Sequence, residues 1–249
     1  MSLKMYFSHA RTVEWCRAVA SIARHHPAVQ SGAAELFVIP TYLSVPAALE
    51  LLGDAVLVGA QDLATEDAGA FTGEVSGAEI AELGCRVVEV GHAERRSVFG
   101  ETDRVVRAKT AAALRNGLTP VLCVGEEVAG DPAAAARECI RQLDDSLVSA
   151  RDAGQAAAYP RLIVAYEPRW AIGAAEPADP EHVRAVCAAL REHVLGLTDF
   201  PGSAVIYGGS ARPGLLPAVG DDVDGLFLGR FAHDPSALAA ILDEVSSFN

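Results

Sequence analysis

The chain has 249 residues, of which 51% are hydrophobic and 21% are charged, a balance that excludes a disordered protein. Its length suits a single α/β barrel domain spanning residues 1–249. The formal net charge of −13 argues against nucleic acid or an anionic membrane as a partner. It does not exclude an anionic small substrate, because a helix N-terminus can bind an anion locally.

The five cysteines include no C-x-x-C pair, which indicates buried thiols in a reducing compartment rather than disulfides or a zinc site. No apolar run approaches ~18 residues, and the N-terminus lacks a signal-peptide pattern. We therefore expect a soluble, cytoplasmic protein. The sequence signals neither a metal nor an organic cofactor.

Short apolar runs alternate with longer amphipathic segments along most of the chain. The runs predicted as strands are Leu36–Ile39, Ala55–Val58, Val87–Val90, Pro120–Val124, Leu162–Tyr166, Ala204–Tyr207 and Leu226–Leu228. The segments predicted as helices are Thr12–Arg24, Val45–Leu52, Ser76–Leu83, Asp103–Asn116, Pro132–Asp152, Pro180–Leu195 and Pro235–Val245. Cap-like residues at their starts are Thr12, Ser44, Ser76, Asp131, Asp179 and Asp234.

Strands that are apolar on both faces and alternate with helices predict a parallel sheet covered by helices. Seven strands in 249 residues give about 36 residues per unit, and an eighth would give about 31. We therefore predict an α/β fold, a single (β/α)8 barrel. A doubly wound open sheet is the alternative, but no G-x-G-x-x-G motif follows the first strand.

The first strand is the exception to this regular pattern. Only Met1, Ser2 and Leu3 precede Lys4, whereas a strand usually has ~5–6 residues. Either the barrel begins with a truncated strand, or the true start of the protein lies upstream. We expect a distorted seam here, because a missing half-strand leaves backbone groups of the flanking strands unpaired.

Polar residues follow several of the predicted strands, at the face where a parallel barrel collects its catalytic groups. These residues are Lys4, Gln61, His92, Glu94, Glu167, Ser210 and Gly229. One cation, one imidazole and one carboxylate on a common face suit proton transfer next to a carbonyl. Taken singly, a histidine after a strand is more often structural, and a lysine is usually solvated.

The stretch Val164–Gly173, V-A-Y-E-P-R-W-A-I-G, carries the clearest of these signals. An apolar strand delivers Glu167, Pro168 ends the strand ladder, and a hydrophobic loop follows. A carboxylate under a loop that excludes water is where a catalytic base would lie. The alternative is a solvated loop acid before a turn proline.

Two glycine-containing segments, Ile206–Ser210 and Gly225–Gly229, end the last two predicted strands. Glycines let backbone N–H groups approach a ligand closely, and phosphate sites after the last two strands recur in such barrels. Glycines that serve only tight turns are the alternative for either segment alone. Both segments together favour a phosphate site.

Five motifs in this chain, in this order, resemble triosephosphate isomerase. They are G-A-F-T-G-E-V-S (Gly69–Ser76), V-G-H-A-E-R-R (Val90–Arg96), V-L-C-V-G-E (Val121–Glu126), A-Y-E-P-R-W-A-I-G (Ala165–Gly173) and Y-G-G-S (Tyr207–Ser210). The resemblance covers nearly the whole chain. It implies a cofactor-independent isomerase that interconverts glyceraldehyde 3-phosphate and dihydroxyacetone phosphate through an enediolate, as in glycolysis.

The resemblance also implies roles for individual residues. Glu167 matches the base that moves the proton, and His92 matches the neutral imidazole that polarises the carbonyl. Lys4 matches the cation that binds substrate, with Glu94 as the acid beside the histidine. That enzyme is an established example of pKa tuning and of lid closure. Its chemistry needs a base, an oxyanion donor and a site closed to water.

Other positions match the phosphate site, the lid and the dimer contact of that family. Gly173, Ser210 and Gly229 match phosphate-contacting positions. The lid corresponds to residues 171–176, which include Ala171, Ile172, Ala174, Ala175 and Glu176. The third loop, which docks into a partner subunit in that family, includes Phe71, Thr72 and Gly73, so a homodimer is implied.

The chain departs from the family pattern around the substrate. Ser2 stands where an asparagine usually precedes the lysine by two positions, and Ala93 replaces the serine after the histidine. The lid ends Ala174-Ala175-Glu176 instead of a small residue, a glycine and a lysine. Arg230 replaces the second glycine of the last phosphate pair, where it would be strained if φ were positive, or would pair with phosphate.

These departures leave the acid, the imidazole and the lysine in place. Some bacterial relatives of this enzyme isomerise a four-carbon erythrulose phosphate, and the ending G-L-F-L-G-R-F is similar to theirs. The sequence therefore leaves two substrates open, a triose phosphate and a tetrulose phosphate. A catalytically inactive phosphosugar-binding protein is the alternative from another class, although a binder needs only the glycine and serine positions.

Overall fold

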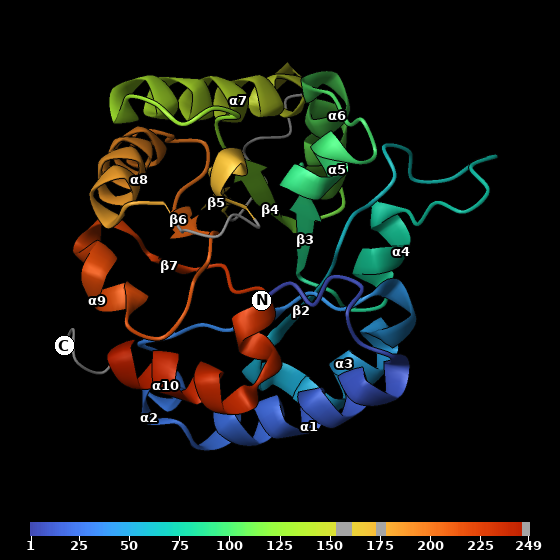
Figure 1. Ribbon diagram of the computed structural model, residues 1–249. Helices are drawn as coiled ribbons and strands as arrows, with labels where there is room; N and C mark the ends of the chain where they lie inside the picture. Colours follow the sequence, from blue (N-terminus) through green and yellow to red (C-terminus); the bar gives the residue numbers. More distant parts are fainter. Residues whose placement is uncertain (153–160, 173–177, 246–249) are drawn as a thin grey trace.

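The computed structural model describes residues 1–152, 161–172 and 178–245. Its strands form one parallel sheet in the order β1-β2-β3-β4-β5-β6-β7, which curls into a barrel (Figure 1). The strands are β1 (Phe37–Val38), β2 (Leu57–Ala60), β3 (Val87–Val90), β4 (Thr119–Val124), β5 (Ile163–Tyr166), β6 (Ala204–Tyr207) and β7 (Gly225–Leu226). The predicted α/β barrel is confirmed.

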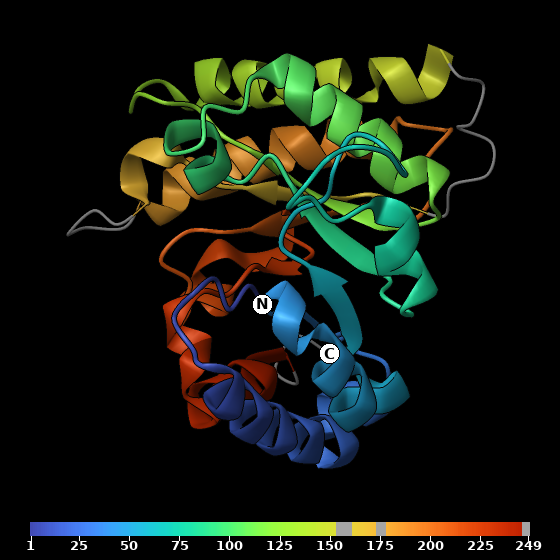
Figure 2. The ribbon, with the colours of Figure 1, turned by 90° about the vertical axis from the view of Figure 1, so that its right-hand side faces the viewer.

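Helices surround the barrel on its outside, as Figures 1 and 2 show from two directions. The α-helices are α1 (His9–His25), α2 (Pro27–Gln30), α3 (Val45–Leu52), α4 (Gly77–Glu82), α5 (Ala93–Ser97), α6 (Asp103–Arg115), α7 (Pro132–Asp152), α8 (Pro180–Leu195), α9 (Leu215–Val219) and α10 (Pro235–Val245). Short 3-10 helices are η1 (Tyr42–Ser44), η2 (Gly53–Ala55), η4 (Arg169–Ala171), η5 (Gly220–Asp222) and η6 (Arg230–His233).

Side chains of each strand alternate between two apolar layers, as the twofold period of a strand requires. In β4, Val121 and Cys123 point into the barrel, whereas Leu122 and Val124 pack against the helices. The inner layer is small, with Ile39, Val87, Val121, Cys123, Ile163, Ala165, Ile206 and Phe227 among its buried members. The barrel interior is therefore a packed core that supports whatever lies on its upper rim.

Four of the six predicted residues cap their helix, and two do not. Ser44 precedes α3, but its hydroxyl is hydrogen-bonded to Nδ1 of His9 and caps no backbone N–H of the helix. Ser76, Asp131, Asp179 and Asp234 each accept a backbone N–H of their helix. Thr12 was predicted to begin α1, but the helix begins one turn earlier, where the Ser8 hydroxyl accepts the N–H of Arg11. The prediction was wrong because Ser8 competes for the same role, and Thr12 lies inside the helix, where its hydroxyl bonds the Ser8 carbonyl.

Residues 1–3 close the ring between β1 and β7. The Leu3 N–H donates to the Ile39 carbonyl at 3.0 Å, and the Ile39 N–H donates to the Met1 carbonyl at 2.8 Å. On the other side, the Ser2 N–H donates to the Leu228 carbonyl at 3.1 Å. Figure 1 places this end of the chain near the middle of the barrel, and Met1 is buried. The expected truncated first strand is therefore present as a short bridge.

Below this bridge, at the amino ends of the strands, the seam contains a largely apolar cavity of about 390 Å³. Its lining includes Met1 and Phe37 on one side, Leu226 on the other, and Ile241 and Leu242 of α10. The cavity lies beside the seam between β1 and β7, at the end of the barrel opposite the strand carboxyl ends.

Candidate active site

The carboxyl ends of the strands open on a cavity of about 160 Å³. The predicted site residues that line it are Ser2, Lys4, His92, Glu94, Glu167, Ile172, Ser210, Gly229 and Arg230. They are spread along the chain from residue 2 to residue 230, and the parallel strands bring them to one rim. This cavity is the candidate active site.

Glu167 directly follows β5, and its backbone N–H donates to the Val124 carbonyl at 2.8 Å. Its side chain is buried, with a carboxylate oxygen 3.5 Å from Nε2 of His92. A Cβ at Gly208 would lie 2.9 Å from Cγ of Glu167, so glycine at this position leaves room for the acid. Burial, and then the charge of Glu89, raises the pKa of Glu167 to about 8. Glu167 is therefore a stronger base than a solvated glutamate.

His92 is the N-cap residue of α5, and its Nδ1 accepts the backbone N–H of Glu94 at 3.1 Å. A neutral ring whose Nδ1 is an acceptor carries its proton on Nε2, which faces Glu167. Burial, and then the charge of Lys4, lowers the pKa of His92 to about 4. The imidazole is therefore neutral at physiological pH and presents one N–H donor to the cavity.

Lys4 has a backbone φ of 47°, the one positive value at a non-glycine residue within the ranges described above. Gln61 holds this segment, because its Nε2 donates to the Lys4 carbonyl at 2.9 Å. The Lys4 ammonium lies 2.7 Å from a Glu94 oxygen. Burial acts to lower the pKa of Lys4, but the hydrogen bond and charge of Glu94 and the charges of Glu167 and Glu89 raise it overall. A strained backbone thus holds a charged ammonium in the site.

The two glycine segments predicted to bind phosphate lie on the same rim. Gly209 and Ser210 follow β6, Gly229 follows β7, and all three line the cavity. Arg230 begins η6, and its side chain is exposed at the cavity. Its φ is not positive, so the strain considered for a side chain at this position is absent.

The predicted lid is described only at its beginning. Ala171 is buried in η4, and Ile172 lines the cavity. The remaining predicted lid residues, Gly173, Ala174, Ala175 and Glu176, lie outside the described residues. Next to this segment, Nε1 of Trp170 donates to a Glu126 oxygen at 2.7 Å, which fixes the start of the loop.

The predicted dimer loop lies in the long connection between β2 and α4, which reaches away from the barrel in Figure 1. Phe71, Thr72 and Gly73 are exposed in this connection, and 49% of the Phe71 surface is accessible to solvent. A large aromatic side chain in water at a projecting loop is suited to a contact with another protein.

Comparison with known proteins agrees with this geometry. The sequence profile described as "Triosephosphate isomerase" matches residues 1–245. The chain belongs to the triosephosphate isomerase family.

Two relatives of the chain differ in their sequence identity to it. An L-erythrulose-1-phosphate isomerase from Pectobacterium atrosepticum is 51% identical over 98% of the chain and 93% of the relative. A triosephosphate isomerase from Moorella thermoacetica is 39% identical over 93% of both chains. The chain is thus an isomerase of the triosephosphate isomerase family, and family membership implies a phosphosugar substrate.

Sequence reasoning missed Tyr6 and Phe231, which line the cavity, and Glu89, a buried carboxylate beside His92. Glu89 lies within β3 and is 3% exposed, with an oxygen 3.7 Å from Nε2 of His92. It was overlooked because only the polar residues after each apolar run were considered. Alternation along Val87–Val90 was the available signal, since Val87 points into the barrel and Glu89 follows it by two.

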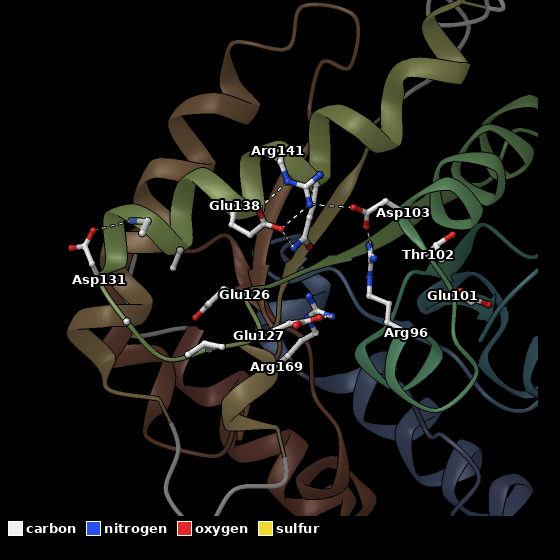
Figure 3. A pocket seen from close by; sticks show the side chains of 15 residues that line it. Arg96, Glu101, Thr102, Asp103, Glu126, Glu127, Asp131, Glu138, Arg141 and Arg169 are labelled. Carbon is white, nitrogen blue, oxygen red and sulfur yellow. Dashed lines mark hydrogen bonds and ion pairs between the residues drawn. The ribbon is translucent and has the colours of Figure 1, made fainter.

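A second cavity of about 640 Å³ lies outside the barrel, between α7 and the loops after β3, β4 and β5 (Figure 3). Its charged side chains pair with one another. Arg141 contacts Glu138 and Asp103, at 2.7 Å and 3.1 Å, and Arg169 contacts Glu127 at 2.8 Å. The lining nevertheless has an excess of acidic side chains, because Glu101, Glu126 and Asp131 add to the three paired acids.

The remaining sequence expectations concern cysteines, metals and membranes. All five cysteines are buried free thiols, as predicted. Within residues 1–152, 161–172 and 178–245, no cluster of histidine, cysteine or acidic side chains has the form of a metal site. No helix of those residues is long and apolar enough to cross a membrane.

Proposed function

We propose that the chain isomerises a four-carbon ketose phosphate of the L-erythrulose 1-phosphate type. The observation that carries this proposal is the 51% identity to an L-erythrulose-1-phosphate isomerase over nearly the whole chain. Triosephosphate isomerases from three bacteria are 36%, 39% and 42% identical. The departures from the triosephosphate isomerase pattern, at Ser2, Ala93 and Arg230, surround the substrate and leave the reacting groups in place.

The chemistry of this substrate follows from moving one proton between neighbouring carbons. In a tetrulose 1-phosphate the carbonyl is at C2, and the acidic hydrogen farther from the phosphate is on C3. Removing it gives an enediolate over C2 and C3. Returning a proton to C2, while the hydroxyl proton on the C3 oxygen moves to the C2 oxygen, moves the carbonyl to C3. The product is therefore another ketose, whose phosphate lies on C4 when the chain is renumbered. No atom or electron is gained or lost.

Glu167 is the proposed base, since its buried carboxylate lines the cavity next to the imidazole of His92. The Nε2–H of His92 and the ammonium of Lys4 stabilise the oxyanion that develops. Glu94 holds the ammonium at 2.7 Å and, through its backbone N–H, fixes the histidine tautomer. Glu167 therefore moves the proton between the two carbons, and Nε2 of His92 is the proposed carrier of the proton that moves between the two oxygens.

The phosphate is proposed to bind at Ser210 and Gly229 on the rim, together with Gly173, which matches a phosphate-contacting position of the family. The guanidinium of Arg230 lies at the same cavity and adds a charge that suits a phosphate dianion. Closure of residues 171–176 keeps water away from the enediolate, which would otherwise lose its phosphate by elimination. Phe71, Thr72 and Gly73 are proposed to dock into a second copy of the chain.

A three-carbon substrate is the second candidate, because the family profile and several relatives carry the name triosephosphate isomerase. Both candidates use the same proton transfer. They differ in whether the reacting carbon farther from the phosphate carries a hydroxymethyl group or a hydrogen. The cavity must hold that extra group for the first candidate to be correct.

An isomerisation assay on the purified protein separates the candidates. L-Erythrulose 1-phosphate and dihydroxyacetone phosphate are compared by kcat/KM, with Glu167→Gln as the control that removes the base. We expect higher kcat/KM for the tetrulose phosphate and loss of both activities in the control. A preference for the triose would contradict the proposal, and undiminished turnover by Glu167→Gln would contradict the assignment of the base.

A further inference from the structure

Glu89 is a buried carboxyl group that the reaction described above does not use. It lies on β3, two residues after Val87. It therefore points to the same side of the strand as Val87, into the barrel. One oxygen lies 3.7 Å from Nε2 of His92. The other oxygen has no hydrogen-bond partner in the described part of the chain, although it is fully shielded from solvent. Such an oxygen is costly unless a ligand or a neighbour uses it.

Ser2 connects Glu89 to the cavity. The Ser2 side chain lines the cavity and lies within hydrogen-bonding reach of the Glu89 carboxyl group. When a serine donates its single hydrogen to a carboxyl group, its oxygen presents lone pairs in the opposite direction. Those lone pairs then face the substrate and can accept a hydrogen bond from a hydroxyl group.

The position of this pair matches the far end of a longer substrate. The phosphate-binding segments, with Ser210 and Gly229, follow the ends of their strands and form the upper rim. Glu89 lies within a strand, and Ser2 is bridged to Ile39 at the end of β1, so both are deeper in the barrel. A sugar held by its phosphate at the rim therefore directs its other end toward Ser2 and Glu89.

We propose that Ser2 and Glu89 form a subsite that recognises the terminal hydroxymethyl group of a tetrulose phosphate. Ser2 contacts the hydroxyl group, and Glu89 is the positioning residue that orients the Ser2 hydroxyl. Serine is smaller than the asparagine usual in the family and leaves the volume that the extra carbon needs. This inference rests on the proposed four-carbon substrate and names the residues that select it.

The test compares two substrates that differ only in the recognised group. L-Erythrulose 1-phosphate carries a hydroxymethyl group, and its 4-deoxy analogue carries a methyl group in the same place. The ratio of kcat/KM for the two is measured in the wild type, Ser2→Ala, Glu89→Leu, Glu89→Gln and the double variant of Ser2→Ala with Glu89→Leu. Glu50→Gln, an exposed change on α3, is the matched control.

The wild-type ratio should be about 10- to 100-fold in favour of the hydroxyl, the range expected when a buried polar group loses its hydrogen-bond partner. Ser2→Ala and Glu89→Leu should each bring the ratio close to one, and the double variant should add nothing further. Glu89→Gln should keep part of the ratio, because its amide oxygen still accepts from Ser2. A general folding defect would lower both rates and leave the ratio unchanged.

The outcomes separate this inference from the proposed function. A wild type that turns over triose phosphates but not the tetrulose overturns both. The inference alone is overturned if the wild type prefers the tetrulose phosphate but Glu89→Leu and Glu89→Gln both keep the wild-type ratio of kcat/KM for the hydroxymethyl and methyl substrates. Should Glu89→Leu fail to fold, the ratios of Ser2→Ala and Glu89→Gln still decide the question.

Discussion

Replacing Glu89 by glutamine should change how the stability of the protein depends on pH. Burial, opposed by the Ser2 hydrogen bond and the charges of Lys4 and the Met1 amino group, raises the pKa of Glu89 from 4.5 to about 7. The folded state therefore binds this proton more tightly than the unfolded state. The resulting stability is fully present below pH 4.5 and is lost as pH rises through about 7.

The size of the effect follows from the shift. A difference of about 2.5 pKa units between the two states, at 1.36 kcal/mol per unit, corresponds to about 3 kcal/mol. Glu89→Gln has no such proton to lose. Its free energy of unfolding, relative to the wild type, should therefore increase by about 3 kcal/mol between about pH 4.5 and pH 7. The same substitution removes the Glu89 charge and so lowers the pKa of Glu167. This change also increases the stability of the variant relative to the wild type as the pH rises.

Urea unfolding at a series of pH values measures this difference. Both proteins are followed at one protein concentration, because association changes apparent stability. Glu50→Gln, an exposed carboxylate on α3, is the control and should track the wild type at each pH. A difference between the wild type and Glu89→Gln that stays constant with pH would refute the reasoning, since Glu89 would then have the same pKa in both states.

Three further predictions concern activity and assembly. The acid limb of the pH profile of kcat/KM should lie near the raised pKa of Glu167, about 8, because only the carboxylate abstracts a proton. Glu89→Gln should move that limb to lower pH, and an unmoved limb would mean that the two carboxyl groups do not interact. Gly208→Ala places a methyl 2.9 Å from Cγ of Glu167, so kcat should fall about 100-fold with little change in circular dichroism. An unchanged kcat would show that the base does not depend on that space. Phe71→Asp should convert a dimer to monomers in sedimentation velocity, and a wild type that sediments as a monomer would remove the basis for a dimer.

The strands and helices predicted correctly from the sequence are those specified by residues close together in the chain. Val87–Val90 and Ala204–Tyr207 match β3 and β6 to the residue, since both are apolar runs of the length of one strand. α7, α8 and α10 begin at the predicted prolines, because the aspartate before each proline caps the helix. Such signals act within a few residues and need no tertiary structure.

The features that the sequence did not predict depend on contacts between distant segments. Glu89 becomes a buried acid only when the barrel closes and brings Ser2 and His92 against it. The absence of strain at Arg230 likewise depends on the path of η6. The short helices α2 and α9 are too brief to show a helical period. For such features, the sequence fixes residue types but not their neighbours.

The closure of the barrel by residues 1–3 has a consequence for motion. The ring is joined at this point by a few hydrogen bonds beside an apolar cavity, so it should open locally more readily than the longer ladders among β3, β4 and β5. Its amides, at Ser2, Leu3 and Ile39, should exchange with deuterium sooner than those in the middle of β4. Lys4 directly follows this link, so a local opening removes the ammonium from the site while the rest of the barrel stays folded. Inactivation on heating should therefore precede loss of helical signal.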